Sequence, residues 1–323
     1  MTAVMDTPVL LIVWRRPSTL SRLIEAIRPV APSRLFVACD GPRSGRSGEL
    51  DKVLETRRVI EERVDWTCEI QRLYSDENMG CRLGVSRGIS WFFEQVEEGI
   101  ILEEDCIPHP DFFIYCTSLL ERYRNDQRIF SICGSNFQCG QRRGTASYYF
   151  SIHGDSWGWA TWRRAWSTYN KAEHDWSVFR DSGQLKQVFS IPLERHYWRV
   201  TLDQLFKHNL PNTWDYQWFL AGWMNHALHI WPNANLISNA GHDGEGTHTF
   251  GANAFSDMPL ESLKRIDHPI FVLPDRAADA YSFYRRRSGV RFAFECLLGP
   301  LYQFATPVLR GCMRLYRAYG GRY

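Results

Sequence analysis

Three consecutive acids, Glu103, Glu104 and Asp105, come directly after the apolar residues 100–102. The apolar run has the composition of the end of a buried strand. Carboxylates in such a place repel one another and lose hydration, so they need a cation, a basic partner or an exposed edge. Their oxygens suit Mg²⁺ or Mn²⁺, which complete their shells with water and substrate phosphates. The stretch therefore indicates a metal site for a phosphate-bearing substrate, and a solvated acidic turn is the alternative.

Asp215 is the candidate proton acceptor. It follows Pro211 and lies between Trp214 and Trp218, at the start of a helix predicted to run to about residue 226. Burial between indoles raises the pKa of a carboxylate and a helix N-terminus lowers it, and the balance fits a base that works near neutral pH. An N-cap without a catalytic role is the alternative, because aspartate is common there.

Further charged residues lie on loops that follow predicted strands. Arg15 and Arg16 follow the first strand, Asp40 follows the second, and Arg82 follows a glycine turn after the third. Arginines suit a diphosphate or a base edge, and an aspartate accepts hydrogen bonds from ribose hydroxyls or a base N–H. Exposed loop charges and an ordinary Asp-Gly turn are the alternatives.

Flat aromatic rings and a glycine-rich loop supply the other candidates. Aromatic residues make up 14% of the chain, and Trp157, Trp159 and Trp214 are candidate acceptor contacts, since ring faces stack on sugars as well as filling cores. The loop from 239 to 250 has the composition of a lid over a bound substrate. Within it, either His242 or His248 would complete a metal shell or contact a diphosphate.

Alternating strand and helix patterns position these residues. Apolar runs predict strands at 8–14, 35–39, 68–73, 100–102, 129–134, 148–152 and 229–237, and helical patterns separate the first four of these runs. Three βα units in a row predict an α/β fold with a mostly parallel, doubly wound sheet. Ligands of such sheets bind at the carboxyl ends of the strands, which is where the acids fall.

Composition and charge bound the class of protein. The 323 residues are 44% hydrophobic and 23% charged with a net charge of +2, so we expect a folded soluble protein that does not bind nucleic acid. Nine cysteines without a CxxC pair indicate a reducing compartment. No basic leader and no run of eighteen apolar residues occurs, so we expect a cytoplasmic protein, with peripheral contact at the inner face of a membrane as an option.

The C-terminal part, residues 276–323, differs in character from the rest. From 281 onward it combines eight arginines with aromatic and leucine side chains against one acid, Glu295. This mixture suits the surface of an anionic membrane, and a basic helix pair packed on the main domain is the alternative. We expect a domain at 1–275, with a nucleotide-binding half at 1–135 and an acceptor-binding half at 136–275, followed by this tail.

The residues at 101–113, ILEEDCIPHPDFF, together with Asp40 and the stretch 214–218, WDYQW, carry a family resemblance. The chain resembles GT-A-fold nucleotide-sugar glycosyltransferases, in particular a bacterial family-2-like group called hemolytic-protein-like, and is similar to animal N-acetylglucosaminyltransferase I. The resemblance covers about residues 8–250. It implies a GT-A-type, Rossmann-like sheet flanked by helices, with a helical C-terminal extension.

The resemblance also implies roles for single residues. Asp105 takes the place of the last acid of the DxD motif, which binds Mn²⁺ or Mg²⁺ beside the donor diphosphate, and Glu103 and Glu104 would contact the donor sugar or ribose. Glu104 departs from the aspartate usual in the family. Asp40 and Arg16 would bind uridine, Asp215 would be the catalytic base, and His248 would contact the metal or the donor from the lid.

The leading hypothesis is a metal-dependent inverting glycosyltransferase that moves a sugar from a nucleotide-sugar, expected to be a UDP-sugar, to a glycan or lipid-linked acceptor. A nucleotidylyltransferase is the enzymatic alternative, but it would carry a phosphate loop rich in glycine and lysine after the first strand, and residues 14–18 do not supply one. A noncatalytic carbohydrate-binding protein of the same fold is the alternative from another class.

Overall fold

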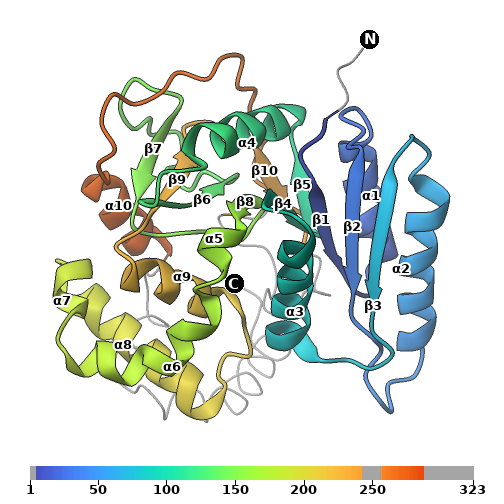
Figure 1. The fold of residues 1–323 in the computed structure, drawn as a ribbon, viewed down its shortest axis with the longest axis horizontal. Coiled ribbons are helices and arrows are strands. Elements are labelled where there is room, and N and C mark those ends of the chain that lie inside the picture. The colour runs from blue at the N-terminus through green and yellow to red at the C-terminus, as the bar shows by residue number, and fades with distance from the viewer. Residues whose placement is uncertain (1–4, 242–254, 256, 287–323) are drawn as a thin grey trace, which may run out of the picture. The chain divides into compact units, whose positions relative to one another are not determined.

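A mixed sheet of eight strands organises the fold in this computed structural model, which describes residues 5–241, 255 and 257–286. The strand order is β3-β2-β1-β4-β8-β6-β9-β7, and only β8 and β7 run against the common direction. The strands are β1 Val9–Val13, β2 Arg34–Cys39, β3 Glu69–Tyr74, β4 Glu98–Glu103, β6 Ile129–Cys133, β7 Tyr148–Ser151, β8 Trp159–Trp162 and β9 Leu228–Pro232. The predicted α/β class with a mostly parallel sheet is confirmed (Figure 1).

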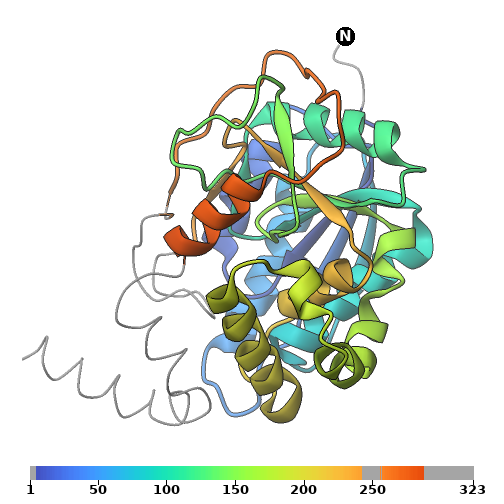
Figure 2. The same cartoon turned by 90° about the vertical axis from the view of Figure 1, so that its left-hand side faces the viewer.

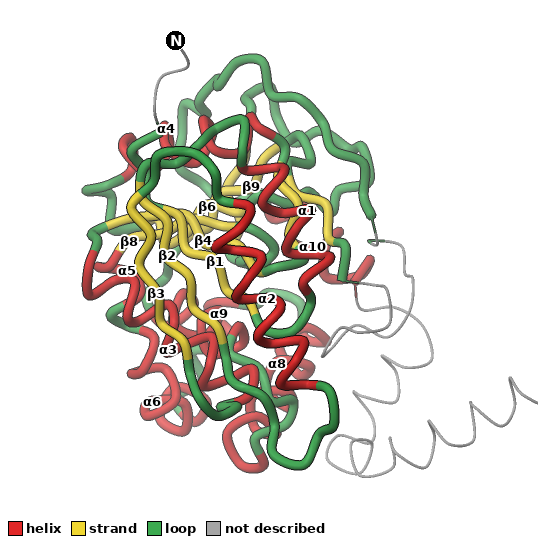
Figure 3. The backbone as a smooth tube through the Cα atoms, turned by 90° about the vertical axis from the view of Figure 1, so that its right-hand side faces the viewer, coloured by secondary structure: helices red, strands yellow, loops and turns green. Residues whose placement is uncertain are grey.

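Helices cover both faces of the parallel half of the sheet. The helices α1 and α2 pack on each other on one face, and α3 covers the other face (Figures 1 and 3). The contact between α3 and the sheet is close, because a Cβ at Gly88 would lie 2.7 Å from the Cβ of Ala38. The helices of this region are α1 Pro17–Ile27, α2 Glu49–Arg63, α3 Gly80–Gln95, α4 Pro110–Tyr123, α5 Arg163–Trp166 and α9 Asp215–Met224.

The chain divides into two compact units. The first comprises Met1–His174 and Trp214–Asp279 and holds the whole sheet, and the second comprises Asp175–Thr213 and Ala280–Tyr323. The second unit contains α7 Leu185–Val188 and α8 Pro192–His208, while α6 Tyr169–Asp181 and α10 Arg276–Arg286 each begin in the first unit and end in the second. Within the described chain, no helix combines the length and apolar character needed to cross a membrane.

The buried strands β1 and β4 consist of the continuous apolar runs from which they were predicted. In β1, Val9, Leu10 and Leu11 have no exposed surface, and the same holds for Ile100 and Leu102 in β4. These runs lie under helices on both faces, so their sequences are continuously apolar and do not alternate. The end of β4 therefore emerges from a dry core directly into the acidic turn.

The predicted strand at 229–237 is two strands. The first part is β9 of the large sheet, and the second, β10 Ile237–Asn239, pairs antiparallel with β5 Cys106–Pro108. The residues between them leave the large sheet and return beside the acidic turn, where the Ala240 N–H donates to the Asp105 carbonyl oxygen at 2.8 Å. This two-stranded ribbon attaches residues 237–241 to the turn that carries Asp105.

Candidate functional site

The acidic turn is attached to the end of β1. Strands β1 and β4 pair with Ile12 opposite Glu103, and the Glu104 N–H donates to the Ile12 carbonyl at 3.0 Å. The Glu104 carboxylate in turn accepts a hydrogen bond from the Trp14 N–H at 2.8 Å. Both contacts follow from the parallel pairing, which brings the carboxyl ends of the two strands to one edge. Glu104 is thereby buried and fixed by the backbone of the neighbouring loop.

Arg16 joins two of the three acids. Its Nε donates to Glu104 Oε1 at 2.7 Å and its Nη2 to Asp105 Oδ2 at 2.9 Å. Burial lowers the pKa of this guanidinium, but the two carboxylates outweigh burial and raise the pKa, so Arg16 is charged at every working pH. Burial also raises the pKa of Glu104, although Arg16 and the Trp14 N–H oppose the shift. Arg16, which the sequence assigned to a diphosphate or a base edge, thus forms ion pairs with Glu104 and Asp105.

Glu103 has the most perturbed environment of the three acids. Burial raises its pKa to about 8, and repulsion from Asp105 and Asp215 acts in the same direction. A hydrogen bond from the Trp214 side chain and the charge of Arg16 oppose this shift. Glu103 therefore carries a proton over much of the neutral range unless a further cation reaches the acids.

Asp215 reaches the acids from a distant part of the sequence. It is the first residue of α9, directly after Trp214, and it lies close enough to Glu103 to raise the pKa of that carboxyl by repulsion. The structure therefore brings the predicted base and the predicted metal-binding turn together within the first unit. The central feature of this site is a cluster of carboxylates in which Arg16 binds Glu104 and Asp105, and in which Glu103 interacts with Asp105 and Asp215.

The acids fit a divalent ion held by few protein ligands. Among the residues that the structure describes, no group of three or more His, Cys, Asp or Glu side chains is arranged so that it could hold a metal ion by itself. Mg²⁺ and Mn²⁺ sites at phosphates do not need one, because one or two carboxylates suffice when water and phosphate oxygens complete the shell. The mutual repulsion of Glu103, Asp105 and Asp215 is the property that an added cation would relieve.

The two histidines predicted to act from the loop, His242 and His248, lie outside the described residues. The described chain reaches Gly241, whose position is informative by itself. A Cβ built there would lie 2.2 Å from Asp105 Oδ2 and 3.1 Å from Arg16 Nη1. The residue that leads into 242–254 therefore lies directly against the ion pair and must be glycine for the pair to keep its geometry.

Asp40 has a structural task that the sequence did not reveal. Its carboxylate accepts hydrogen bonds from the N–H groups of Gly41, Met79 and Gly80 and from the Asn78 side chain, at 2.8 to 3.1 Å. It thus fixes the end of β2 to the start of α3, where Gly80 has a φ of 78°. These donors fill the acceptor positions of the carboxylate, so a uridine contact at Asp40 would have to replace one of them.

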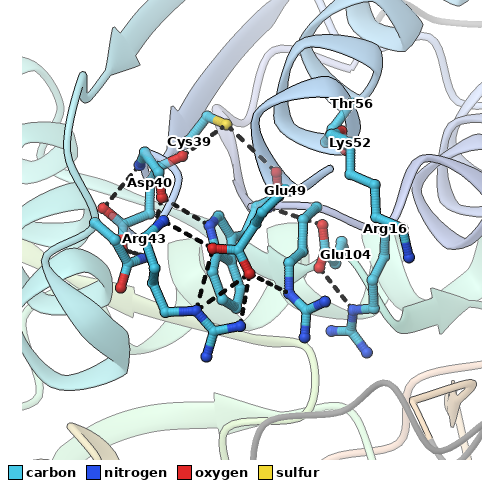
Figure 4. A network of polar contacts seen from close by, with 12 residues as sticks. Arg16, Cys39, Asp40, Arg43, Glu49, Lys52, Thr56 and Glu104 are labelled. Carbon is cyan, nitrogen blue, oxygen red and sulfur yellow. Dashed lines mark hydrogen bonds and ion pairs between the residues drawn. The ribbon is translucent and has the colours of Figure 1, made fainter. Parts of the chain in front are cut away.

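Arg15 belongs to a network beside the acids and has no contact with them. Its guanidinium lies 4.6 Å from the ring centre of Trp14, and Arg43 lies 5.0 Å from the same ring. Glu49 at the start of α2 holds both arginines, since it lies 2.6 Å from Arg43 Nη2 and 3.7 Å from Arg15 Nε. Figure 4 shows the contacts between Glu49 and Arg43. Arg43 lowers the pKa of Glu49 through their hydrogen bonds.

Arg82 forms an ion pair with Glu173 at the start of α6. It lies in the first turn of α3. The preceding residue, Cys81, also belongs to the site but was not a candidate from the sequence. Burial raises the pKa of the Cys81 thiol, and Glu103, Asp215 and Asp40 add to the shift. The thiol is therefore neutral. Its position after the glycine turn was the one available signal.

Two of the three tryptophans proposed as acceptor contacts are core residues. Trp159 has no exposed surface, and Trp214 is 2% exposed. Their rings stack on each other with centres 5.6 Å apart, and Trp218 and Trp166 pack on the same cluster. The prediction that Trp159 and Trp214 stack on a sugar is wrong, because no ring face is accessible.

Trp157 differs from these two tryptophans because it is partly exposed. Its ring packs edge-on against Phe137, with the two ring centres 5.4 Å apart. It therefore stays a candidate acceptor contact.

Comparison with known proteins leaves the family open. No protein-family model matches the chain, and no curated protein matches its sequence. Among solved structures, HddC from Yersinia pseudotuberculosis is similar over 49% of this chain and 77% of its own, with 10% identity and a TM-score of 0.30. The 4-diphosphocytidyl-2C-methyl-D-erythritol synthase from Anaerococcus prevotii is similar over 51% of this chain and 76% of its own, with 10% identity and a TM-score of 0.33.

A UDP-glucose pyrophosphorylase complexed with UDP-glucose is similar over 47% of this chain and 64% of its own. The identity is 13% and the TM-score 0.27. Similarity at this level does not assign a family or an activity.

Proposed function

We propose that the protein is a metal-dependent inverting glycosyltransferase that takes a sugar from a nucleotide-sugar, expected to be a UDP-sugar. The observation that carries this proposal is the meeting of Asp215 with the acidic turn at Glu103. The carboxylate at the helix start can accept a proton. The neighbouring acidic cluster, which needs a cation, can accommodate a diphosphate together with a metal ion.

The acidic turn would bind the donor. Asp105 would hold Mn²⁺ or Mg²⁺, and when bound the ion would offset the negative charge of the departing diphosphate. Arg16 would orient Asp105 through the hydrogen bond that it already donates. Its Nη1 is buried and has no hydrogen-bond partner among the described residues, so it offers a further donor next to Gly241. A phosphate oxygen is the kind of acceptor that a guanidinium in this position prefers.

Asp215 would act on the acceptor. As the acceptor hydroxyl attacks the anomeric carbon, its proton passes to Asp215, and the bond from that carbon to the diphosphate oxygen breaks. A single displacement of this kind inverts the configuration at the anomeric carbon. We keep a glycan or lipid-linked molecule as the expected acceptor, with Trp157 as its candidate contact. Cytoplasmic location, with contact at the inner face of a membrane, remains the matching expectation.

The loop after β1 favours sugar transfer over nucleotidyl transfer. Residues 14–17 contain neither glycine nor lysine, and α1 begins at Pro17. The Trp14 N–H is already bound to Glu104, and the Arg16 side chain is bound to Glu104 and Asp105. A phosphate-binding loop instead presents free backbone N–H groups.

Product analysis tests the proposal. The full-length protein is incubated with Mn²⁺ and a set of UDP-sugars, and separately with UTP and sugar 1-phosphates. We expect UDP release, with water or an added sugar as acceptor, and no pyrophosphate from UTP. Asp105→Asn should abolish release, whereas Asp126→Asn, which alters a carboxylate paired with Arg128 at 2.7 Å, should not. Pyrophosphate release would make the protein a nucleotidylyltransferase, and UDP binding without turnover would make it a noncatalytic binder.

A further inference from the structure

Residues 268–274, here called the apical loop, have the sequence His-Pro-Ile-Phe-Val-Leu-Pro and expose apolar side chains to solvent. Ile270 is 90% exposed, Phe271 71% and Leu273 69%. Three large apolar side chains within four residues form a concentrated exposed patch, in contrast to the scattered apolar residues found on ordinary surfaces. The segment is drawn in orange in Figure 2, on the approach to α10.

Both ends of the apical loop are fixed to the edge strand β7. The Ser147 N–H donates to the Asp267 carbonyl at 2.8 Å, and the Asp275 N–H donates to the Phe150 carbonyl at 2.8 Å. Pro274 also forms a bridge with Phe150. The two attachment points, Ser147 directly before β7 and Phe150 within it, are three residues apart in the chain, whereas Asp267 and Asp275 are eight residues apart. The excess length must arch outward, which places the apolar side chains at the apex.

The base of the arch is further fixed by side chains. The Ser147 hydroxyl donates to the Arg265 carbonyl and accepts from the Asp267 N–H, at 2.9 and 2.8 Å. The Tyr148 hydroxyl and His268 Nδ1 are 3.0 Å apart. At the other end, Asp275 accepts a hydrogen bond from the Ala278 N–H in the first turn of α10. The loop is thus held in one shape, so binding through its apex loses little conformational entropy.

Charge around the apical loop suits an anionic surface. The loop has no acidic, lysine or arginine residue, and burial together with nearby Arg122 lowers the pKa of His268, which keeps it neutral. The charges beside the loop are four cations, Lys264, Arg265, Arg276 and Arg122, against three carboxylates, Asp267, Asp275 and Asp279. Two of the cations are paired, Arg265 with Asp267 at 2.7 Å and Arg276 with Asp279 at 3.8 Å. An uncharged apex with a cationic rim is the pattern of peptide segments that enter the headgroup region of a bilayer.

We propose that the apical loop is a membrane-insertion element that places Ile270, Phe271 and Leu273 among the lipids of an anionic bilayer. A protein partner fits less well, since a stable protein interface covers about 800 Å² on each side and needs a broad surface. Three side chains on one arch are small for that purpose and sufficient for shallow insertion. The proposal concerns residues 268–274 and does not depend on the proposed transferase activity.

Vesicle flotation tests the proposal with the full-length protein. The probe is vesicles of phosphatidylcholine and phosphatidylglycerol. The loop variant carries Phe271→Gln and Leu273→Gln. The matched control carries Leu54→Gln and Val178→Gln, which remove side chains that are 46% and 72% exposed. We expect the loop variant to lose about tenfold or more in vesicle affinity, because most of the insertable apolar surface is gone, and the control to stay within about twofold of the parent.

A second variant and two readouts keep the result decisive. Ile270→Asp should weaken binding at least as much, and all variants should keep the melting temperature of the parent protein, since the changed side chains are exposed. Equal vesicle affinity of the parent and both loop variants would overturn the proposal, as would absence of binding by the parent. Light scattering identifies the other occupant: a dimer that the loop substitutions dissociate would assign the patch to a second copy of the chain and reject the membrane.

Discussion

Arg16 Nη2 lies 2.9 Å from Asp105 Oδ2, so the carboxylate proposed to hold a metal is already paired with a cation of the protein. The pair is largely buried, and the same guanidinium also binds Glu104 at 2.7 Å. A buried carboxylate without such a partner is costly. Arg16 therefore allows the acidic turn to fold before any substrate or ion arrives.

Removing the Arg16 charge should destabilise the protein. We expect Arg16→Met to lower the free energy of unfolding by roughly 3–5 kcal/mol, because two buried carboxylates lose their partner. Urea denaturation measures the loss. Mn²⁺ should restore part of the stability in the variant, since the ion can replace the lost charge. Arg128→Met, which removes an exposed partner of Asp126, serves as the control and should change stability little. Equal losses in the two variants would contradict the assigned role of Arg16.

Asp215→Asn should separate binding from turnover. We expect kcat to fall by about 10²- to 10⁴-fold, because the amide cannot accept the acceptor proton. The Kd for UDP should stay within about twofold of the parent value. Steady-state kinetics and calorimetry measure the two quantities. The isosteric change Asp126→Asn is the control for the loss of a carboxylate elsewhere. Full turnover by Asp215→Asn would remove this residue as the base.

Metal affinity should depend on pH through Glu103. Its pKa of about 8 means that a proton occupies the site at lower pH, and an incoming Mn²⁺ must displace that proton. Affinity should therefore rise by up to about tenfold per pH unit below 8 and level off above it.

Calorimetry in buffers of different ionisation enthalpy should show release of up to about one proton at pH 7. Glu103→Gln should bind Mn²⁺ with a flatter pH profile, whatever its absolute affinity. An unchanged profile in this variant would assign the proton to another group.

His229 should make the fold sensitive to acid. It is fully buried in β9, its Nδ1 lies 2.7 Å from the Ser131 hydroxyl, and burial lowers its pKa to about 3. The unfolded chain takes up this proton near pH 6.5, so stability is complete above that pH and is lost as the pH falls toward 3. The loss is about 1.4 kcal/mol per pH unit and roughly 5 kcal/mol in total.

Urea denaturation between pH 6.5 and 5 measures the slope of this loss. His229→Gln should reduce the dependence of the free energy of unfolding on pH by about 1.4 kcal/mol per pH unit, the value for one proton. This holds even if the variant is less stable overall. The exposed His174→Gln serves as the control and should leave the slope unchanged. Identical slopes in the parent and His229→Gln would show that another group takes up the proton.

The parallel half of the sheet could be read from the sequence. Apolar runs of strand length, separated by helical patterns, identified β1, β2, β3 and β4 with their order of helices. Right-handed parallel units bring all carboxyl ends to one edge, so the proximity of Arg16 to the acids followed from topology. The part of the site whose arrangement the sequence indicated is therefore the part built from consecutive βα units.

Contacts made by chain segments far apart in sequence could not be read in this way. The sequence indicated a ribose or base contact for Asp40, with an Asp-Gly turn as the alternative, but residues 78–80 at the start of α3 supply its donors from a distance of 38 to 40 residues in the chain. Trp159 and Trp214 have ring faces suited to sugars, but each covers the other. Residue type shows what a side chain can bind, whereas its neighbours in the fold decide whether anything can reach it.

The Trp214 side chain donates a hydrogen bond to Glu103, while its ring lies stacked in the tryptophan cluster. An indole in such a place senses the local electric field, and a change of charge on Glu103 alters that field. Arrival of a metal ion or a nucleotide at the acids should thus shift the fluorescence of Trp214. Trp214 fluorescence should therefore report binding at the acids without an added label and before any bond is made or broken.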